Sequence, residues 1–178
     1  MSGLVCLSYF YNSCHLPCIW NPYAEEYKVV PIPTALKPYR QHVDVRENGF
    51  GYDDMDNEYI FINTTGSQVG RLGYLGSIVS AYSLKSNSWK QQLYIPYVFP
   101  VDKNTHTPPG VFFSGAFHWF ARRILEKNAS SSSGVLIALD VETGVVREIP
   151  EPGRLDVDDK YVDMLGGCLV IMESRNLA

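Results

Sequence analysis

The chain has 178 residues, of which 46% are hydrophobic and 19% are charged, so it is too apolar to be a disordered segment. With 15 basic and 19 acidic residues it carries a formal net charge of −4, and it has no basic stripe that would neutralise the phosphates of a nucleic acid. Its 13% aromatic residues, 14 glycines and 11 prolines are typical of strands separated by turns.

The amino terminus has no basic region, and polar residues interrupt its apolar run, so we do not expect a signal peptide. No apolar stretch reaches the roughly 18 residues that a membrane-spanning helix needs. The four cysteines are too few and too clustered for a disulfide framework. These features predict a reducing compartment, the cytoplasm or the nucleus, with no nucleic-acid or membrane partner.

A repeat begins near residue 19 and recurs twice along the chain. In each copy an apolar residue precedes a small polar residue, and a second apolar residue lies seven positions after the first, just before a basic residue. The small polar residue suits the start of a turn, and the register fits a hairpin with the basic residue on the exposed face of its returning strand. The apolar pairs are Trp20 and Tyr27, Tyr82 and Trp89, and Leu139 and Val146; Asn21, Ser83 and Asp140 start the turns, and Lys28, Lys90 and Arg147 are basic.

A second unit, a glycine-rich string followed by an apolar run, alternates with these hairpins. Together the two units recur every 55 to 62 residues and supply four strand candidates, a, b, c and d. In the clearest copy the candidates cover 49–52, 59–62, 79–84 and 89–93. Four short antiparallel strands per repeat indicate an all-β fold of kelch-like β-propeller blades.

The repeats amount to about three blades, whereas propellers typically close with four to eight. We therefore expect residues 1–178 to form one incomplete propeller domain, a fragment that is partial at both ends. One segment conflicts with the repeat, because the apolar spacing over 117–127 read alone predicts a helix. The repeat instead predicts strand b over 116–121, which includes Trp119, and we follow the repeat.

Six of these strings resemble, in order and spacing, the F-box-associated (F-box/kelch-like) domain of plant F-box proteins. They are Gly3–Leu7, Trp20–Pro22, Gly49–Asp53, Tyr82–Lys90, Gly115–Trp119 and Leu165–Leu169. The resemblance implies the substrate-recognition subunit of an SCF-type E3 ubiquitin ligase, including the pollen self-incompatibility subfamily, with a target protein for ubiquitination as partner. Family members bind a Skp-type adaptor through an amino-terminal F-box; no helical module precedes Gly3, so we expect this chain alone not to join a ligase.

The chain offers no catalytic, metal or cofactor site that we can assemble from its motifs. The acidic residues at 53–58 lack the glycine and glutamate of a calcium loop and fit a turn between strands a and b. Cys14, His15 and Cys18 fall short of the four ligands of tetrahedral zinc, and cysteines in loops and strands behave as small apolar residues.

Two further features have structural interpretations. The glycine-rich segment 66–76 lacks the pattern of a phosphate-binding or dinucleotide-binding loop, so we expect a flexible loop. His118 follows an apolar run in a predicted strand, where a neutral histidine that holds a backbone group is expected rather than a general base. We therefore expect that the chain is not an enzyme and needs no cofactor.

Loop lengths point to a binding face. The connections from b to c and from d to a (8–17, 34–48, 63–78, 94–109 and 122–134) are long and emerge at one end of the antiparallel blades. Recognition residues are often in loops on a rigid scaffold, and Tyr and Arg are enriched among binding hot spots. We predict that the partner-binding residues on this face are Tyr9, Tyr11, Tyr39, Arg40, Arg71, Tyr74, Tyr97, Phe99, Arg122 and Arg123.

A glycan-binding or hydrolytic propeller is the alternative function, since aromatic-lined propeller faces can hold sugars. A hydrolase would need two carboxylates about 5 to 10 Å apart near that face. The acidic residues of the long connections are Asp44, Glu47, Asp102 and Glu126.

The repeat also makes a prediction about stability. It places Trp89 between blades, where truncation of a buried aromatic side chain costs about 3–5 kcal/mol. It places Lys90 on the opposite, exposed face, where replacement by alanine is expected to cost within about 0.5 kcal/mol.

Overall fold

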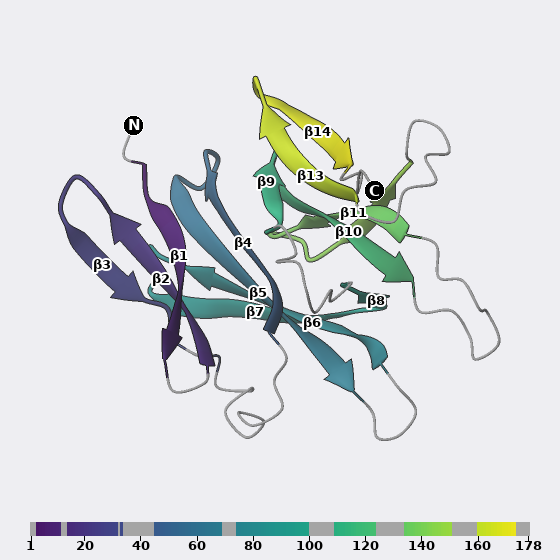
Figure 1. The fold of residues 1–178 in the computed structure, drawn as a ribbon, viewed down its shortest axis with the longest axis horizontal. Coiled ribbons are helices and arrows are strands. Elements are labelled where there is room, and N and C mark those ends of the chain that lie inside the picture. The colour runs from purple at the N-terminus through teal and green to yellow at the C-terminus, as the bar shows by residue number, and fades with distance from the viewer. Residues whose placement is uncertain are drawn as a thin grey trace, which may run out of the picture. The chain divides into compact units, whose positions relative to one another are not determined.

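The computed structural model describes residues 3–11, 14–31, 33, 45–68, 74–99, 109–123, 134–150 and 160–173. Within them, the side chains of residues 8–11, 14, 15, 45–47, 67, 68, 74, 75, 91 and 173 are not described. Every regular element of the described part is a β-strand, and all strand pairs within the sheets are antiparallel (Figure 1). The all-β prediction is therefore confirmed. The chain forms two compact units, residues 1–43 and 44–178.

The unit of residues 1–43 contains one three-stranded sheet, which we call the first sheet. Its strands correspond to b, c and d of the predicted first blade, and they pair in the order β1-β2-β3. Beyond β3, the backbone N–H of Val30 donates to the carbonyl oxygen of Pro17 (2.9 Å). The strands are β1 (Val5–Tyr11), β2 (Cys14–Asn21) and β3 (Glu26–Val29).

The second sheet is the complete copy of the repeat, with four strands in the order β4-β5-β6-β7. Candidates a, b and d lie within these strands, and candidate c does so except for Leu84, which follows the end of β6, so the predicted blade is confirmed. Two strands extend further than predicted, because β5 continues through Gly66–Gln68 and β6 begins at Tyr74. The ends of the glycine-rich segment therefore pair as strands rather than forming a loop. The bounds are β4 (Val45–Asp53), β5 (Glu58–Gln68), β6 (Tyr74–Ser83) and β7 (Ser88–Ile95).

The third sheet repeats this plan with one change at the position of strand a. Strand β10 pairs with β11 on one side, and on its other side with two separate short strands, β9 at one end and β8 at the other. Strand β8 is absent from the predicted repeat and lies within the predicted connection 94–109. The bounds are β8 (Tyr97–Val98), β9 (Val111–Phe113), β10 (Ala116–Arg123), β11 (Gly134–Asp140) and β12 (Val146–Ile149).

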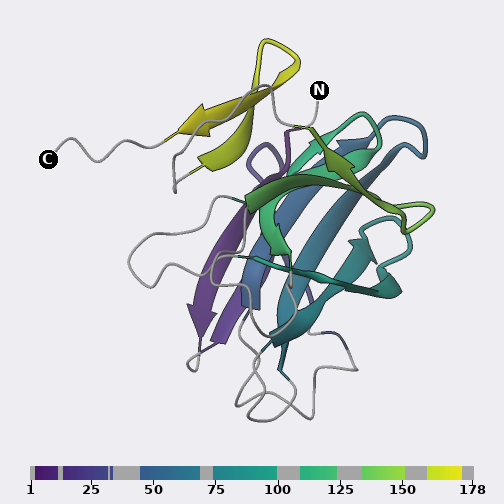
Figure 2. The same ribbon diagram turned by 90° about the vertical axis from the view of Figure 1, so that its right-hand side faces the viewer.

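The last sheet has two strands, β13 (Lys160–Leu165) and β14 (Cys168–Glu173), which correspond to a and b of a further blade. It lies beside the third sheet, as Figures 1 and 2 show for the yellow hairpin and the green strands. Val162 of β13 is buried, and the Nζ atom of Lys160 lies 6.0 Å from the ring centroid of Phe120 on β10. The described strands thus amount to about three blades of an incomplete propeller.

The predicted hairpins form with the predicted register. Each apolar pair seven residues apart is a directly opposed cross-strand pair: Trp20 with Tyr27, Tyr82 with Trp89, and Leu139 with Val146. The turn-starting oxygens also act as expected, because Asn21, Ser83 and Asp140 accept hydrogen bonds from backbone N–H groups two or three residues later. The basic residues Lys28, Lys90 and Arg147 are exposed, as predicted.

These turns share a residue in the left-handed region. It lies five positions after the first member of the cross-strand pair, where the chain must reverse, and it has a positive φ angle that side chains with a Cβ atom adopt at a cost. The hairpin between β4 and β5 follows the same plan, with Asp53 accepting from the N–H of Met55. The residues with this backbone are Glu25 (55°), Asn57 (51°), Asn87 (54°) and Gly144 (71°).

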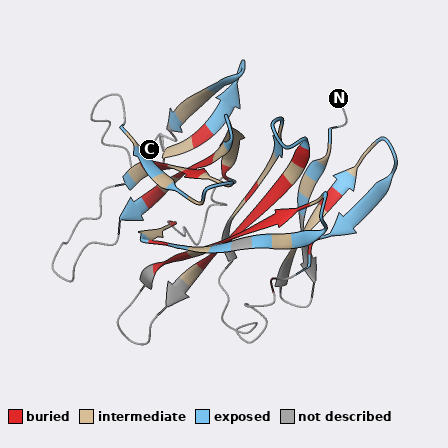
Figure 3. Ribbon diagram, turned by 180° about the vertical axis from the view of Figure 1, so that it is seen from behind, coloured by how far each residue is buried: buried red, intermediate tan, exposed pale blue. Residues whose placement is uncertain are grey.

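The main core lies between the second and third sheets, where buried residues concentrate (Figure 3). Close packing depends on glycine at two positions, because Gly51 of β4 faces β9 of the third sheet and Gly110 packs against Trp119 within the third sheet. A Cβ atom on Gly51 would lie 2.1 Å from Cβ of Phe112, and one on Gly110 would lie 1.9 Å from the ring of Trp119. The backbone N–H of Gly110 donates to the carbonyl oxygen of Asn48 (2.8 Å). The glycines of the predicted motifs therefore let neighbouring sheets touch.

Candidate interaction surface

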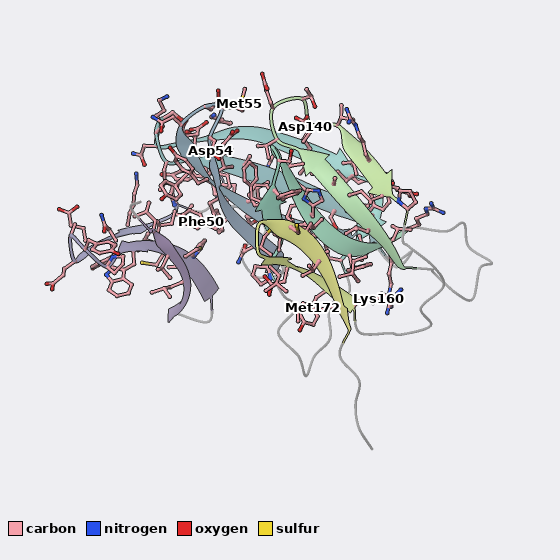
Figure 4. The ribbon with its side chains drawn as sticks, turned by 90° about the horizontal axis from the view of Figure 1, so that it is seen from above. Phe50, Asp54, Met55, Asp140, Lys160 and Met172 are labelled. Atoms are coloured by element: carbon pink, nitrogen blue, oxygen red, sulfur yellow. The ribbon has the colours of Figure 1, made fainter. Side chains whose placement is uncertain are left out.

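The two ends of each sheet in unit 44–178 differ in character. Because neighbouring strands are antiparallel, the a–b and c–d hairpins turn at one end, which we call the hairpin end, and the b–c and d–a segments connect at the other, the connection end. The hairpin end is made of short turns such as 54–57, and Figure 4 shows Asp54 and Met55 there. The connection end is where the partner-binding face was predicted.

The structure shortens all five predicted connections, since β4 begins at Val45, β7 ends at Ile95, and β10 runs to Arg123, so that Arg122 and Arg123 lie in a strand. Strand β1 runs to Tyr11 and β2 starts at Cys14, so Tyr9 and Tyr11 lie in a strand and not in a loop over 8–17. Tyr74 likewise begins β6, which corrects the predicted loop over 63–78. The side chains of these three tyrosines, and all of Tyr39, Arg40 and Arg71, lie outside the described residues.

Phe99 does not belong to a binding face. Its side chain is fully buried (0% exposed), and its ring packs edge-on against Trp119 with a centroid distance of 5.6 Å. The segment after β8 therefore places an aromatic residue in the core between the second and third sheets. The prediction that Phe99 contacts a partner is wrong, because a residue without accessible surface cannot form a contact.

Tyr97 and Arg123 meet at the connection end of the third sheet. They are opposed residues of β8 and β10, and both side chains bond to Glu148 of β12. The Nε atom of Arg123 donates to Oε1 of Glu148 (2.6 Å), and its Nη2 atom donates to Oε2, so the contact is bidentate. The Tyr97 hydroxyl donates to Oε1 (3.0 Å). We call these three residues the rim cluster.

Electrostatics favours the charged forms of the ion pair in the rim cluster. Hydrogen bonding from Arg123 lowers the pKa of Glu148, and the same bond raises the pKa of Arg123. Burial, and then the bond to the Glu148 carboxylate, raises the pKa of Tyr97. At neutral pH the cluster therefore holds a guanidinium, a carboxylate and a neutral phenol, so it has no net charge.

The rim cluster also closes one edge of the core. Tyr97 packs against the buried residues between the second and third sheets, while the side chains of Arg123 and Glu148 remain 48% and 32% exposed. Neighbouring Arg122 is exposed as well, and strand alternation directs it to the other side of β10. The described part of the predicted face is thus an aromatic and arginine-rich strand end on a packed scaffold.

Comparison with known families decides the identity of this scaffold. Residues 3–165 match the F-box associated beta propeller domain. The chain belongs to this family. A comparison with curated proteins and one with solved structures gave no match. The F-box associated domain is a protein-interaction module of F-box proteins and is not catalytic.

Glu148 is the member of the rim cluster that sequence reasoning missed in this F-box associated domain. The repeat could have identified Glu148, because it follows the exposed Arg147 by one residue. Strand alternation then places Glu148 on the inner face of the strand, among apolar neighbours. A charged residue on that face needs a partner. Arg123 could have been named as that partner from its place near the end of strand b, but the length of the strand was uncertain.

The other chemistry-bearing residues are integrated into the F-box associated domain itself. Burial lowers the pKa of His118, although interactions with the backbone of Val111 and Ala116 act in the opposite direction, so the imidazole is neutral at pH 7. Burial, and to a smaller extent Cys18, raises the pKa of the Cys6 thiol to about 11, which leaves few reactive thiolates. The acidic segment after Asp53 forms the predicted turn between β4 and β5.

The described residues also bear on metal, membrane and glycan sites. No group of three His, Cys, Asp or Glu side chains there could hold a metal ion, and the side chains of Cys14 and His15 fall outside that description. No helix in the same part of the chain is long and apolar enough to cross a membrane. Of the acids considered for a glycosidase, Asp44, Asp102 and Glu126 lie outside the described residues, and the side chain of Glu47 is not described.

Proposed function

We propose that this chain is the target-recruiting part of an F-box protein in an SCF-type ubiquitin ligase of plants. The family match over residues 3–165 supports a protein-interaction role, and the six ordered motifs support the plant subfamily that includes self-incompatibility proteins. On this proposal the chain supplies specificity in the cytoplasm or nucleus. The Skp-type adaptor binds through an F-box, and the target is ubiquitinated by the other ligase subunits.

We further propose that the target binds at the connection end of the third sheet. The observation that carries this proposal is the rim cluster, which holds Arg123 and Tyr97 in fixed positions at the surface, while the exposed Arg122 lies at the same end of β10 on its other side. Arg and Tyr side chains that are already ordered lose little conformational entropy on binding, which favours affinity. The guanidinium of Arg123 also has N–H groups that Glu148 does not occupy, so it can still donate to a partner.

The neutral rim cluster suits a target surface with aromatic groups, and Arg122, on the other side of the same strand end, suits an acidic residue of a target that contacts both sides. A phenol ring offers apolar contact area, and an exposed arginine pairs with a carboxylate. This arrangement needs no catalytic group on the chain, because ubiquitin transfer belongs to other subunits. The chain would hold the target in place.

A reconstituted ligase tests both statements. The chain fused behind an F-box is assembled with a Skp adaptor, a cullin and its RING partner, and protein ubiquitination in plant extract is quantified by mass spectrometry. We expect a set of proteins whose ubiquitination falls at least tenfold with Arg122→Glu and Arg123→Ala. The control is Asp54→Lys at the hairpin end, which is expected to retain the set.

Two results would contradict the proposal in different ways. If no protein is ubiquitinated above the level of an assembly that lacks the chain, the ligase role is wrong. If a set is ubiquitinated but Arg122→Glu and Arg123→Ala retain it as well as Asp54→Lys does, the role stands and the proposed surface is wrong. Circular dichroism of each variant shows whether it is folded.

A further inference from the structure

Strand β12 forms one edge of the third sheet. Among the described strands it pairs with β11 alone, while the two faces of its sheet contact the second sheet and the last sheet. Its pairing with β11 has no register shift, and its central residues Arg147 and Glu148 are exposed. The edge of a regular antiparallel strand presents a row of backbone N–H and C=O groups with which a further strand can pair.

The register of β12 shows which of its backbone groups point outward. The N–H of Asp140 donates to the carbonyl oxygen of Val145 (3.0 Å), so these two residues form a hydrogen-bonded pair at the start of the ladder. Bonded and non-bonded pairs alternate along an antiparallel ladder, so Arg147, two residues further on, bonds to β11 again. The N–H and C=O groups of Val146 and Glu148 therefore point away from β11 and supply two donors and two acceptors at the spacing of another strand.

The equivalent edge of the second sheet is less suited to a further strand. Between Ala81 and Tyr82 the register of β6 against β7 shifts, which leaves an extra residue, Lys90, in the edge strand. Such a bulge bends the strand and interrupts the row of outward groups. The ammonium group of Lys90 is also engaged with Glu58. The ladder of β12 has neither feature, so β12 is the better template of the two.

A second copy of β12 would fit this edge poorly. Outward groups must meet outward groups, so the antiparallel register that uses both Val146 and Glu148 places Arg147 opposite the same residue of the other copy. Like charges directly opposite each other destabilise a strand pair. The edge therefore favours a segment of a different sequence.

The two faces of β12 determine which side chains suit such a segment. On the outer face, Arg147 is exposed and forms no ion pair among the described side chains, and the carboxylate of Asp140 already accepts a backbone hydrogen bond (2.8 Å). A carboxylate opposite Arg147 is therefore favoured. On the inner face, Arg123 neutralises Glu148, and Val146 packs against the core. Uncharged aromatic or apolar residues suit the positions opposite these two residues of β12.

We propose that the target adds an extended segment beside β12 as a further antiparallel strand. The segment carries an acidic residue opposite Arg147, and the residues before and after it, opposite Val146 and Glu148, are aromatic or apolar. Its backbone continues the ladder of hydrogen bonds, which supplies affinity, and its alternating side chains supply specificity. The identity of the partner as a ligase target rests on the proposed function, whereas the pairing itself can be measured without a ligase.

A peptide with an acidic residue between two tyrosines, acetyl-Ser-Thr-Tyr-Asp-Tyr-Thr-Ser-amide, is a suitable probe. Fluorescence anisotropy of the labelled peptide, titrated with the full chain, measures its affinity. In antiparallel pairing the N–H groups of both tyrosines face β12, and that of the aspartate points away. N-methylation of the two tyrosine amides is therefore expected to weaken binding about tenfold, because it removes both donors. N-methylation of the aspartate amide is the matched control and is expected to retain binding.

Amide hydrogen exchange locates the peptide on the chain. We expect exchange at the amides of Val146 and Glu148 to slow at least fivefold when the probe binds, whereas the amide of Arg147, which already bonds to β11, does not change. Arg147→Glu is expected to weaken binding of the probe about fivefold and to strengthen binding of a peptide with lysine in place of aspartate. Lys28→Glu, at the equivalent position of the first sheet, is the control and is expected to change neither affinity. Circular dichroism checks that both variants are folded.

Three results would overturn the proposal: a probe that does not bind, tyrosine-methylated and aspartate-methylated peptides that bind equally well, or a Lys28→Glu variant weakened as much as Arg147→Glu. Each of them leaves the ligase role standing, because that role is measured by ubiquitination. If the probe pairs with β12 but the assembled ligase ubiquitinates no protein, the edge binds peptides and the ligase role is wrong.

Discussion

The carboxylate of Glu58 and the ammonium group of Lys90, which are 32 residues apart in the sequence, form an ion pair at the hairpin end of the second sheet. The Glu58 side chain is 3% exposed and that of Lys90 is 41% exposed. The hydroxyl of Ser83 donates a second hydrogen bond to the carboxylate. The exposed lysine thus compensates the buried charge of Glu58. The exposed fraction of Lys90 alone therefore does not indicate how much its side chain stabilises the fold.

Lys90→Ala is therefore expected to cost more than the 0.5 kcal/mol predicted from its exposed position. The variant leaves the buried carboxylate with Ser83 as its remaining side-chain donor, and an uncompensated buried charge lowers the free energy of unfolding by about 2 kcal/mol. Urea denaturation at pH 7 measures the loss. Arg147→Ala, at the equivalent position of the third sheet, is the control and is expected to change stability by less than about 0.5 kcal/mol. Equal losses in the two variants would show that the ion pair does not stabilise the fold.

The same pair predicts a pH dependence. Burial alone would raise the pKa of Glu58, but hydrogen bonds from Lys90 and Ser83 outweigh it and lower the pKa below the ordinary 4.5. Because the folded protein binds this proton more weakly than the unfolded chain does, the stabilisation is complete above pH 4.5 and is lost as pH falls through the lowered pKa. We expect the stability difference between the wild type and Lys90→Met to shrink below pH 4.5. A difference that stays constant from pH 7 to pH 3 would contradict this origin.

Close sheet packing at Gly110 gives a third prediction. A Cβ atom there would lie 1.9 Å from the Trp119 ring, so Gly110→Ala must displace either Trp119 in the core or the backbone of Gly110, whose N–H bonds to Asn48. Overpacking of this kind costs about 1–3 kcal/mol or more, and we expect the upper part of that range. Gly134→Ala is the matched control, because no atom lies within 4 Å of its added Cβ. Thermal denaturation of both variants compares them, and similar melting temperatures would mean that Gly110 does not pack closely against Trp119.

The left-handed turn residues give a fourth prediction. Glu25 occupies the position that Asn57 and Asn87 occupy in other hairpins, at φ 55°. Because asparagine tolerates this backbone better than glutamate, Glu25→Asn is expected to stabilise the chain by about 0.5 kcal/mol. Urea denaturation measures the gain.

The reverse substitution tests the same argument. Asn87→Ala is expected to destabilise the chain by about 1–2 kcal/mol, because it loses both the tolerance of this backbone and the hydrogen bond from the Tyr82 hydroxyl. Asn87→Gly, which keeps the backbone freedom, separates the two contributions. If Asn87→Ala were as stable as the wild type, the left-handed backbone would not matter.

The fold could be predicted from the sequence wherever local pattern and pairing agree. Trp20 and Tyr27 pair as predicted because a short turn fixes the register of the strands that flank it. Strand β10 forms, in place of the helix that its apolar spacing also allows, because β11 supplies hydrogen-bond partners along its length. Tertiary contacts decide whether such an ambiguous segment becomes a helix or a strand. The repeat was sufficient to predict those contacts.

Other features depend on contacts between distant residues and could not be predicted. Strand β8 has two residues and forms because Tyr97 meets Arg123 of β10, which no local pattern shows. The glycine-rich ends of β5 and β6 pair because a ladder of backbone hydrogen bonds does not need side chains. At the candidate surface, arginine and tyrosine positions were found from composition, but the burial of Phe99 and the role of Glu148 follow from packing.

Strand β10 pairs along one edge with two separate short strands, β9 and β8, and this affects which sequence changes the sheet tolerates. Since β9 and β8 pair with opposite ends of β10, the sheet does not require one continuous strand from Val98 to Val111. Insertions between Phe99 and Gly110, which themselves pack against the core, leave both short pairings in place. Related domains can therefore differ in this interval while they share one stable framework, which suits a protein-interaction module.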